Sequence, residues 1–201
     1  IRERIENADG KKPAWSDFAV IIRANAQSRP FEDEFLAAKI PYIIIGGQSL
    51  FDRKEARDVV SFLSLIVNPD ADNQLLRIIN VPPRGLGDKT VDALNAHAVR
   101  HNSRILSLLA APEKVEGLSP KAVDAAKKFH GQIESWRRRL RESGPQGLIK
   151  HILEETDYQQ ELTSLYKDPL DVASRWNEAL EVGESLESYA AKYPHLSPEE
   201  A

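Results

Sequence analysis

The sequence predicts a mainly α-helical protein with a small strand–helix–strand piece at its N-terminus. Two observations support this fold class. Residues 17–45 contain two short apolar runs rich in β-branched residues, with one amphipathic helix pattern between them. After Gly47, apolar residues recur at helical spacing, and N-capping residues, prolines and glycines separate the segments.

The N-terminal piece is predicted to be an α/β unit. The continuous apolar run over residues 17–22 predicts a buried strand, and three apolar residues at i, i+4 and i+7 predict a helix over residues 28–38. A second strand over residues 40–45 ends at two glycines. Since two strands and one helix are too few for a domain, we expect the other strands of this sheet to lie outside the chain.

The rest of the chain predicts a series of helices. Asp52 is a candidate N-cap for the first of them, and Ser119 followed by Pro120 is a start signal for a long one. Gly144 and Pro145 should break that long helix. The predicted helices cover residues 52–67, 72–80, 89–98, 103–110, 120–143, 146–155, 157–166 and 169–189, and a last one starts at 197.

The charge of the chain is unevenly distributed around a net value of −4. Residues 145–201 contain 4 Lys/Arg and 12 Asp/Glu, whereas residues 1–144 contain 23 and 19 and are net positive. The field of a charged group decays over about 8–10 Å at ordinary salt. The acidic region therefore does not exclude a basic face for nucleic acid in the first part.

Composition also limits the class of protein. With no cysteine, the chain forms no disulfide and no thiolate metal site. No apolar run approaches the roughly 20 residues of a membrane span, and the first residues are charged, unlike a secretory signal. We therefore expect a cytoplasmic protein without a membrane partner.

The strongest local signal for chemistry is the segment Arg84–Thr90, between two predicted helices. Two glycines separated by one residue allow a sharp turn with exposed N–H groups, and the next helix N-terminus adds a partial positive charge. This pattern favours contact with the phosphates of a duplex; the alternative is a plain helix–helix connection with Asp88 as N-cap. The predicted duplex-binding residues are Arg84, Gly85, Leu86, Gly87, Lys89 and Thr90.

Two further candidate sites are basic or polar. Lys121 lies at the N-terminus of the predicted long helix, after a Gly-Leu-Ser-Pro turn, and is a second duplex-binding candidate. Arg23 and Asn25 follow the first strand, where ligands commonly bind in α/β sheets. Arg suits a phosphate and Asn suits a sugar, phosphate or base edge. A solvated helix face is the alternative for Lys121, and a cap with a salt bridge for the other two.

Motifs for catalysis are missing. The chain contains no GxxxxGK[ST] loop to cradle the phosphates of ATP, and no HExxH motif. His97 and His101 have a spacing that permits metal binding, but no third ligand accompanies them. We therefore expect that this segment by itself binds no metal and catalyses no reaction.

Residues 18–29, FAVIIRANAQSR, followed by Glu32, resemble the AVLYRxNAQSRxxE stretch of the UvrD/Rep/PcrA family of ATP-dependent DNA helicases. The likeness is specific over residues 17–90, whereas residues 91–201 match only by their helical pattern. Ile22 and Leu50 stand where the family usually has aromatic residues. Further matches follow in the family's order and spacing: Ile40-Pro41-Tyr42, Gly46-Gly47, Phe51–Asp58, Asn68-Pro69-Asp70, Leu76–Asn80, Pro82 and Arg84–Gly87.

The resemblance implies a domain map and a function. Residues 1–45 would be part of the second motor domain, 2A, and residues 46–201 most of the inserted helical subdomain, 2B. Arg23 and Asn25 would contact single-stranded DNA, and the Arg84–Thr90 turn would hold the duplex. The parent protein would use ATP and Mg²⁺ for 3′-to-5′ unwinding in repair or replication, together with partner proteins of those processes. The ATP site would lie in the motor domains outside this chain, so this segment would bind neither ATP nor Mg²⁺.

Two other functions stay open. One is a non-catalytic helical module in which the acidic residues 145–201 dock a protein partner. The other is a subunit of a helicase–nuclease of the wider superfamily. Duplex binding measured against salt separates the interaction module from the leading hypothesis, because phosphate contacts make affinity fall with salt.

Overall fold

The computed structural model describes residues 14–23, 27–45 and 50–192, and it divides the chain into two compact units, residues 1–49 and 50–201. In its described residues the first unit contains a 3-10 turn, η1 (Trp15–Asp17), and the helix α2 (Arg29–Ala37). The second unit is built from helices. The predicted mainly α-helical fold class is therefore confirmed, whereas the assignment of residues 1–45 and 46–201 to subdomains 2A and 2B stays a prediction.

The two predicted strands are not formed in the described part of the first unit. Residues 18–22 and 40–44 have no strand assignment, and the side chains of Ile21 and Ile45 are 95% and 88% exposed. A strand requires a neighbour that completes its hydrogen-bonded ladder, and the described residues provide none. The strand–helix–strand prediction was therefore wrong except for its helix.

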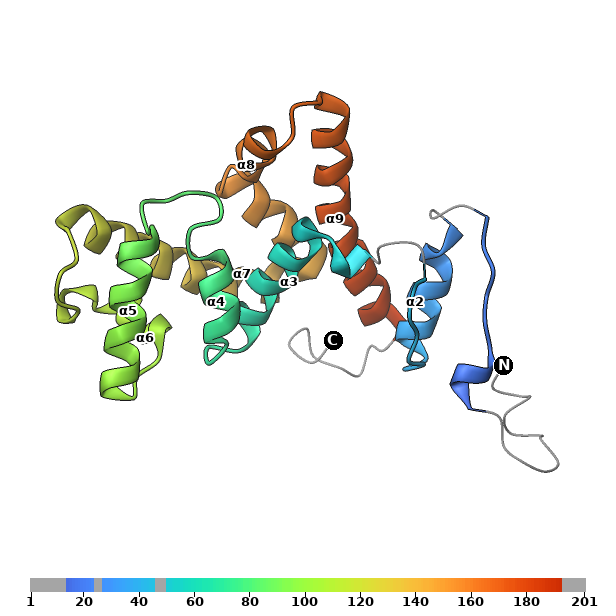
Figure 1. Cartoon of the computed structure of the whole chain (residues 1–201), viewed down its shortest axis with the longest axis horizontal. Coiled ribbons are helices and arrows are strands. Elements are labelled where there is room, and N and C mark those ends of the chain that lie inside the picture. Colours follow the sequence, from blue (N-terminus) through green and yellow to red (C-terminus); the bar gives the residue numbers. More distant parts are fainter. Residues whose placement is uncertain (1–13, 24–26, 46–49, 193–201) are drawn as a thin grey trace. The chain divides into compact units, whose positions relative to one another are not determined.

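The second unit follows the predicted order of helices (Figure 1). Its elements are η3 (Leu50–Asp52), α3 (Lys54–Val67), α4 (Asp72–Ile78), α5 (Asp88–His101), α6 (Ile105–Ala110), η4 (Pro112–Lys114), α7 (Pro120–Glu155), α8 (Tyr158–Leu165) and α9 (Pro169–Lys192). Asp52 is not the N-cap of α3, because it belongs to η3 and Arg53 takes the extended capping conformation. The helix predicted from residue 197 lies outside the described residues.

Helix α7 joins two predicted helices across a kink. Ser119 caps it as predicted, since its Oγ accepts a hydrogen bond from the Ala122 amide at 3.2 Å. Gly144 interrupts the helix with φ 66° and ψ 178°. Trp136 Nε1 donates to Glu155 Oε2 at 2.7 Å, although 19 residues of straight helix would span about 28 Å. The second half of α7 therefore folds back toward the first.

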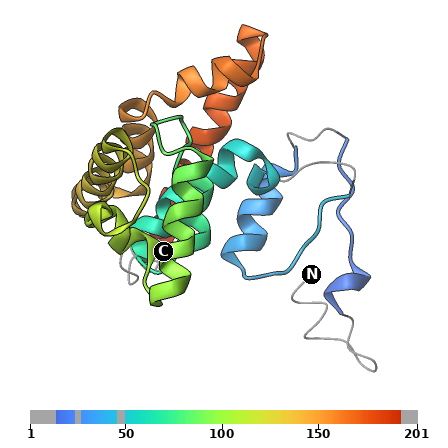
Figure 2. The same cartoon turned by 60° about the vertical axis from the view of Figure 1, so that its left-hand side comes forward.

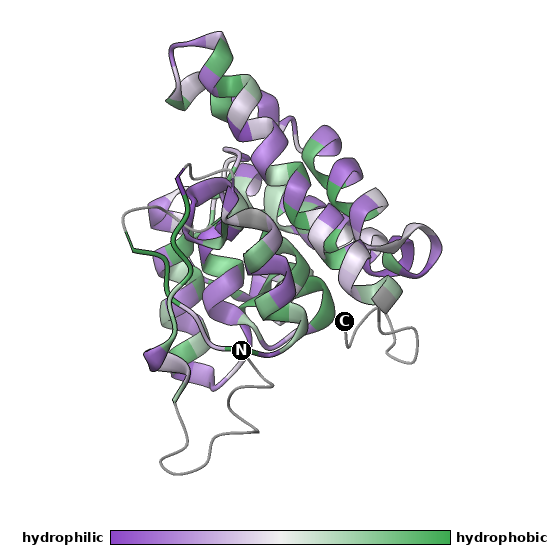
Figure 3. Cartoon of the chain, turned by 90° about the vertical axis from the view of Figure 1, so that its right-hand side faces the viewer, coloured by the Kyte–Doolittle hydropathy of each residue, from purple (hydrophilic) through white to green (hydrophobic). Residues whose placement is uncertain are grey.

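Two hydrophobic clusters form the core of the second unit. Figures 2 and 3 show its helices packed together and banded in apolar and polar residues, the amphipathic pattern that buries one side of each helix. Trp136 is central to one cluster, with edge-on contacts to Phe62 at 5.6 Å and Phe129 at 6.2 Å between ring centroids. Tyr158 lies in the other cluster. The second half of α7 serves both, with Leu148 and Ile152 in the first cluster and Ile149 and Leu153 in the second.

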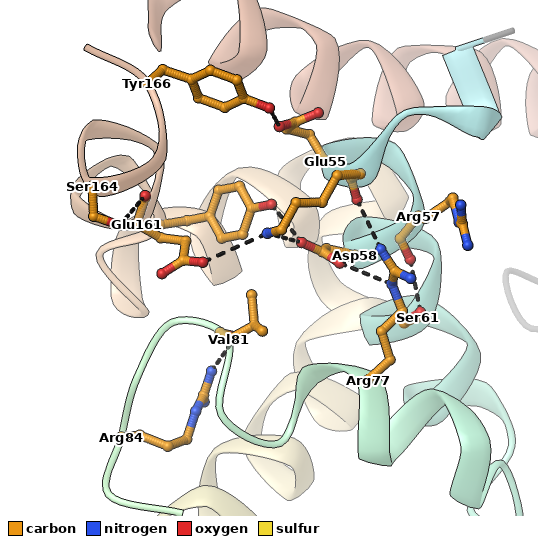
Figure 4. A network of polar contacts seen from close by, with 12 residues as sticks. Glu55, Arg57, Asp58, Ser61, Arg77, Val81, Arg84, Glu161, Ser164 and Tyr166 are labelled. Atoms are coloured by element: carbon orange, nitrogen blue, oxygen red, sulfur yellow. Dashed lines mark hydrogen bonds and ion pairs between the residues drawn. The ribbon is translucent and has the colours of Figure 1, made fainter. Parts of the chain in front are cut away.

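A buried network of charged groups fastens α3 to α4 and α8 (Figure 4). The Asp58 carboxylate, 1% exposed, accepts hydrogen bonds from Arg77 Nε at 2.9 Å, Lys54 Nζ at 2.9 Å and Tyr158 Oη at 2.8 Å. Burial, with Asp58 alongside, raises the pKa of the Tyr158 hydroxyl. A buried carboxylate is tolerated only when its lone pairs are occupied in this way.

A second buried carboxylate on α3 holds the segment before α9. Glu55, 1% exposed, accepts a hydrogen bond from Tyr166 Oη at 2.6 Å. Burial and this hydrogen bond raise the pKa of Tyr166 to about 12. Neither carboxylate stands out in the sequence, because Asp58 and Glu55 lie 100 and 111 residues from these tyrosines.

Candidate nucleic-acid interface

The glycine turn between α4 and α5 is built on the side chain of Asn80. Its Oδ1 accepts hydrogen bonds from the amides of Arg84 at 2.8 Å and of Leu86 at 3.3 Å. Leu86 is fully buried and anchors the turn in the first hydrophobic cluster. Gly85 has φ +85°, a conformation that L side chains rarely adopt, so this position requires glycine.

Gly87 is the N-cap of α5, so Asp88 is the first helical residue and not the cap. The amides of Thr90 and Val91 bond to the Gly87 carbonyl at 2.8 and 3.1 Å. The amides of Asp88 and Lys89 have no acceptor among the described residues, as is usual for the first turn of a helix. A Cβ at Gly87 would meet nothing within 4 Å, so the fold itself leaves open space above this backbone.

Arg84 points into the protein. Its guanidinium lies over the Phe129 ring at 4.2 Å from the centroid, and it donates to the carbonyls of Val81 at 2.5 Å and Pro82 at 3.2 Å (Figure 4). Burial lowers the pKa of the Arg84 guanidinium to about 10. These contacts occupy the group that the sequence analysis assigned to a phosphate, so Arg84 could reach DNA only by leaving them.

Lys89 is the exposed cation of the turn, and Lys121 lies close by on α7. A Cβ built on Gly85 would lie 3.9 Å from the Cβ of Ala125, so the turn rests on α7 one helical turn beyond Lys121. Lys89 and Lys121 are both exposed. The glycine turn therefore packs against the first part of α7, and each of the two helices carries an exposed lysine in its first turn. Asp88, Asp92 and Asp124, also exposed, are the acidic residues next to these lysines along the two helices.

The predicted single-strand site belongs to the first unit. Arg23 is exposed, and its amide donates to Gln27 Oε1 at 3.0 Å. Asn25 lies outside the described residues. The contact of these two residues with DNA stays a prediction.

The two histidines that could suggest a metal site stack on each other. The rings of His97 and His101 lie 4.2 Å apart on α5. Among the described residues, no three His, Cys, Asp or Glu side chains gather around one point.

No helix in the described part of the chain is long and apolar enough to cross a membrane.

An apolar cavity of about 500 Å³ opens between α3, α7 and α9. The side chains that line the cavity carry no charge, so the cavity does not extend the basic surface. The lining residues are Phe51, Val60, Leu63, Ser64, Val67, Asn68, Ala71, Gln74, Leu140, Pro145, Val182 and Leu186.

A helical domain that anchors a glycine turn through a buried leucine and carries a lysine in the first turn of two helices is of a type that can contact phosphate backbones. Comparison with known proteins identifies the family: residues 1–181 match the UvrD-like helicase C-terminal domain. This match covers most of the chain, and the chain belongs to that family.

Named relatives agree with the family match. The chain is 35% identical over 153 residues to the ATP-dependent DNA helicase PcrA of Staphylococcus epidermidis, which covers 76% of this chain and 21% of that protein. It is 34% identical over 163 residues to the ATP-dependent DNA helicase PcrA of Staphylococcus aureus, which covers 81% and 22%. The chain thus spans about a fifth of the length of these relatives.

Proposed function

We propose that this chain is the DNA-binding and regulatory segment of an ATP-dependent 3′-to-5′ DNA helicase. The relatives are named for ATP-dependent DNA helicase activity, and the chain corresponds to about a fifth of their length. The parent protein couples hydrolysis of ATP, with Mg²⁺, to unwinding in repair or replication. Its motor domains act in cis, and the cytoplasm is its compartment.

The observation that carries the proposal is the surface formed by the Gly85–Thr90 turn and Lys121. Free amides at the start of α5 can donate to phosphate oxygens, and the helix dipole favours a negative charge at the same place. Lys89 and Lys121 add two full charges. Contacts of this kind position a protein on the duplex without reading the base sequence.

Arg84 has a supporting role in this proposal. Its contacts with the Phe129 ring and with the carbonyls of Val81 and Pro82 hold the turn in place on the protein side. The exposed residues of the turn face the DNA. Arg23 and Asn25 provide the contact with the single strand, on the strength of the family resemblance.

The test is duplex binding against salt concentration for the wild type and for Lys89→Ala with Lys121→Ala. A duplex of about 20 base pairs carries the fluorescent label, and anisotropy gives the affinity between roughly 50 and 200 mM salt. Loss of two phosphate contacts lowers the slope of log affinity against log salt by about 1.8. The matched control is Lys127→Ala with Arg138→Ala, which removes two exposed cations from the same unit.

Two results would overturn the proposal. One is a wild type that binds no duplex even at the lowest salt, which would favour the protein-interaction module with its acidic residues 145–201. The other is a Lys89/Lys121 variant whose slope equals that of the control.

A further inference from the structure

Three cations lie in one straight line along the first half of α7. Lys121, Lys128 and Arg139 are 7 and 11 residues apart, and at about 100° per residue these steps bring each side chain to within about 20° of the one before. All three are exposed. The line is about 27 Å long at 1.5 Å per residue. It starts beside the glycine turn, because Lys121 is one turn before Ala125, on which Gly85 rests.

The helix surface between these cations is partly open. Ser135 is exposed there, whereas Gln132 is half-buried and donates a hydrogen bond to Glu155 at 3.0 Å. Residues 120–143 contain seven Lys/Arg and three Asp/Glu. One of these acids, Glu134, is paired with Arg137, which also donates to the carbonyl of Leu65 at 3.0 Å. The charge that α7 presents outward is therefore positive.

The acidic groups nearest the line reduce its field without cancelling it. Asp124 and Glu142 are exposed on the adjacent rows of the helix. Glu155 comes close from the second half of α7, but its carboxylate accepts from Trp136 at 2.7 Å and Gln132 at 3.0 Å and pairs with His151 at 3.2 Å. Its charge is thus engaged within the protein.

The chemistry of this face fits the backbone of a duplex better than a single strand. Surfaces that hold single strands offer aromatic rings on which bases stack. Both aromatic residues of this half of α7, Phe129 and Trp136, are at most 1% exposed. A straight row of cations on a rigid helix instead matches the phosphates that a duplex presents at intervals along its length.

We propose that the row formed by Lys121, Lys128 and Arg139 lies along the duplex beyond the glycine turn and contacts phosphates of both strands where they cross it, over about eight base pairs at 3.4 Å each. This inference rests on the proposed function, since the turn fixes where the duplex starts. It adds Lys128 and Arg139 to the DNA-binding residues and gives the contact a direction, from the N-terminus of α7 toward its kink.

The test compares two double variants of the full chain that differ by a rotation about the axis of α7. Lys128→Ala with Arg139→Ala removes two members of the row. Lys127→Ala with Arg138→Ala removes their immediate neighbours, which are also exposed but turned by about 100°; Lys127 is paired with Glu113 at 3.1 Å. Affinity for a duplex of about 20 base pairs is measured against salt, as above. We expect the first variant to lower the salt slope by about 1.8, so that its affinity relative to the wild type falls on the order of tenfold between roughly 200 and 50 mM salt. The second variant should bind nearly as the wild type does.

Duplex length provides a second readout. On a DNA hairpin with a stem of about six base pairs, which is about 20 Å long, the stem reaches Lys128 at about 10 Å along the row but not Arg139 at about 27 Å. The Lys128/Arg139 variant should therefore lower the salt slope by only about 0.9 on this hairpin, half of its effect on the longer duplex. Equal slopes for the two double variants, with a lower slope for Lys89/Lys121, would overturn this inference and leave the proposed function standing. Absence of duplex binding by the wild type would overturn both. Circular dichroism of each variant checks that α7 is intact.

Discussion

Replacement of Arg84 by alanine should lower the stability of the folded protein rather than remove a direct contact with DNA. The cation–π contact with Phe129 contributes about 1 kcal/mol. The two hydrogen bonds from the charged guanidinium to the carbonyls of Val81 and Pro82 contribute about 4 kcal/mol together. Against this, a pKa lowered from 12.5 to about 10 by burial corresponds to a cost of about 3 kcal/mol for keeping the charge there. We therefore expect Arg84→Ala to lower the free energy of unfolding by about 2 kcal/mol.

Thermal unfolding followed by tryptophan fluorescence measures this effect. Trp136 is buried against Phe129 and reports on the packing below Arg84. For a unit of this size, about 2 kcal/mol corresponds to a lower Tm by about 4–8 °C. Lys89→Ala, an exposed change in the same turn, should stay within about 0.5 kcal/mol of the wild type. An unchanged Tm for Arg84→Ala, together with a lower salt slope of duplex binding, would refute the structural role and restore Arg84 as a direct phosphate ligand.

Three further predictions concern the fold. Asp58→Ala should destabilise the protein by about 3–5 kcal/mol in urea denaturation, because it leaves buried donors unpaired. Asp58→Asn should recover part of the lost stability. An equal loss of stability in the two variants would count against a charge-based network. Gly131→Ala should raise the free energy of unfolding by about 0.5–1 kcal/mol, because alanine favours a helix more than glycine does. Gly183→Ala should bring no such gain, because its Cβ would lie 3.0 Å from the backbone of Gln146. Equal gains for the two variants would contradict this packing. The raised pKa of Tyr166 means that the folded state keeps its proton when the unfolded state has lost it, so stability should fall as pH rises from 10 through about 12. Tyr166→Phe should flatten this fall in alkaline unfolding curves, and an unchanged slope would show that Tyr166 does not cause it.

Local signals predicted the helices well. Ser119 and Pro120 predicted the start of α7 because a side-chain cap followed by a proline leaves few other conformations to the chain. Gly144 and Pro145 predicted its break for the same local reason. Asp52 was wrongly chosen as a cap, because the preceding η3 turn moves the start of α3 by one residue.

Features that depend on distant partners could not be predicted from local patterns. The apolar runs near Ile21 and Ile45 indicate burial, but burial in a strand needs neighbours that the described residues do not supply. Arg84 has the spacing of a phosphate ligand, and only the position of Phe129 in the folded chain shows that it turns inward. The position of Lys121 beside the glycine turn likewise became visible only through Ala125. The role of these residues in DNA binding stays a prediction.

The second half of α7 contributes residues to both hydrophobic clusters. Leu148 and Ile152 face one cluster, and Ile149 and Leu153 face the other, so neither cluster can loosen without exposing apolar surface of the other. The second unit should therefore respond to load as one body. A force applied at the glycine turn would therefore pass along α7 to α9 without separate loosening of either cluster.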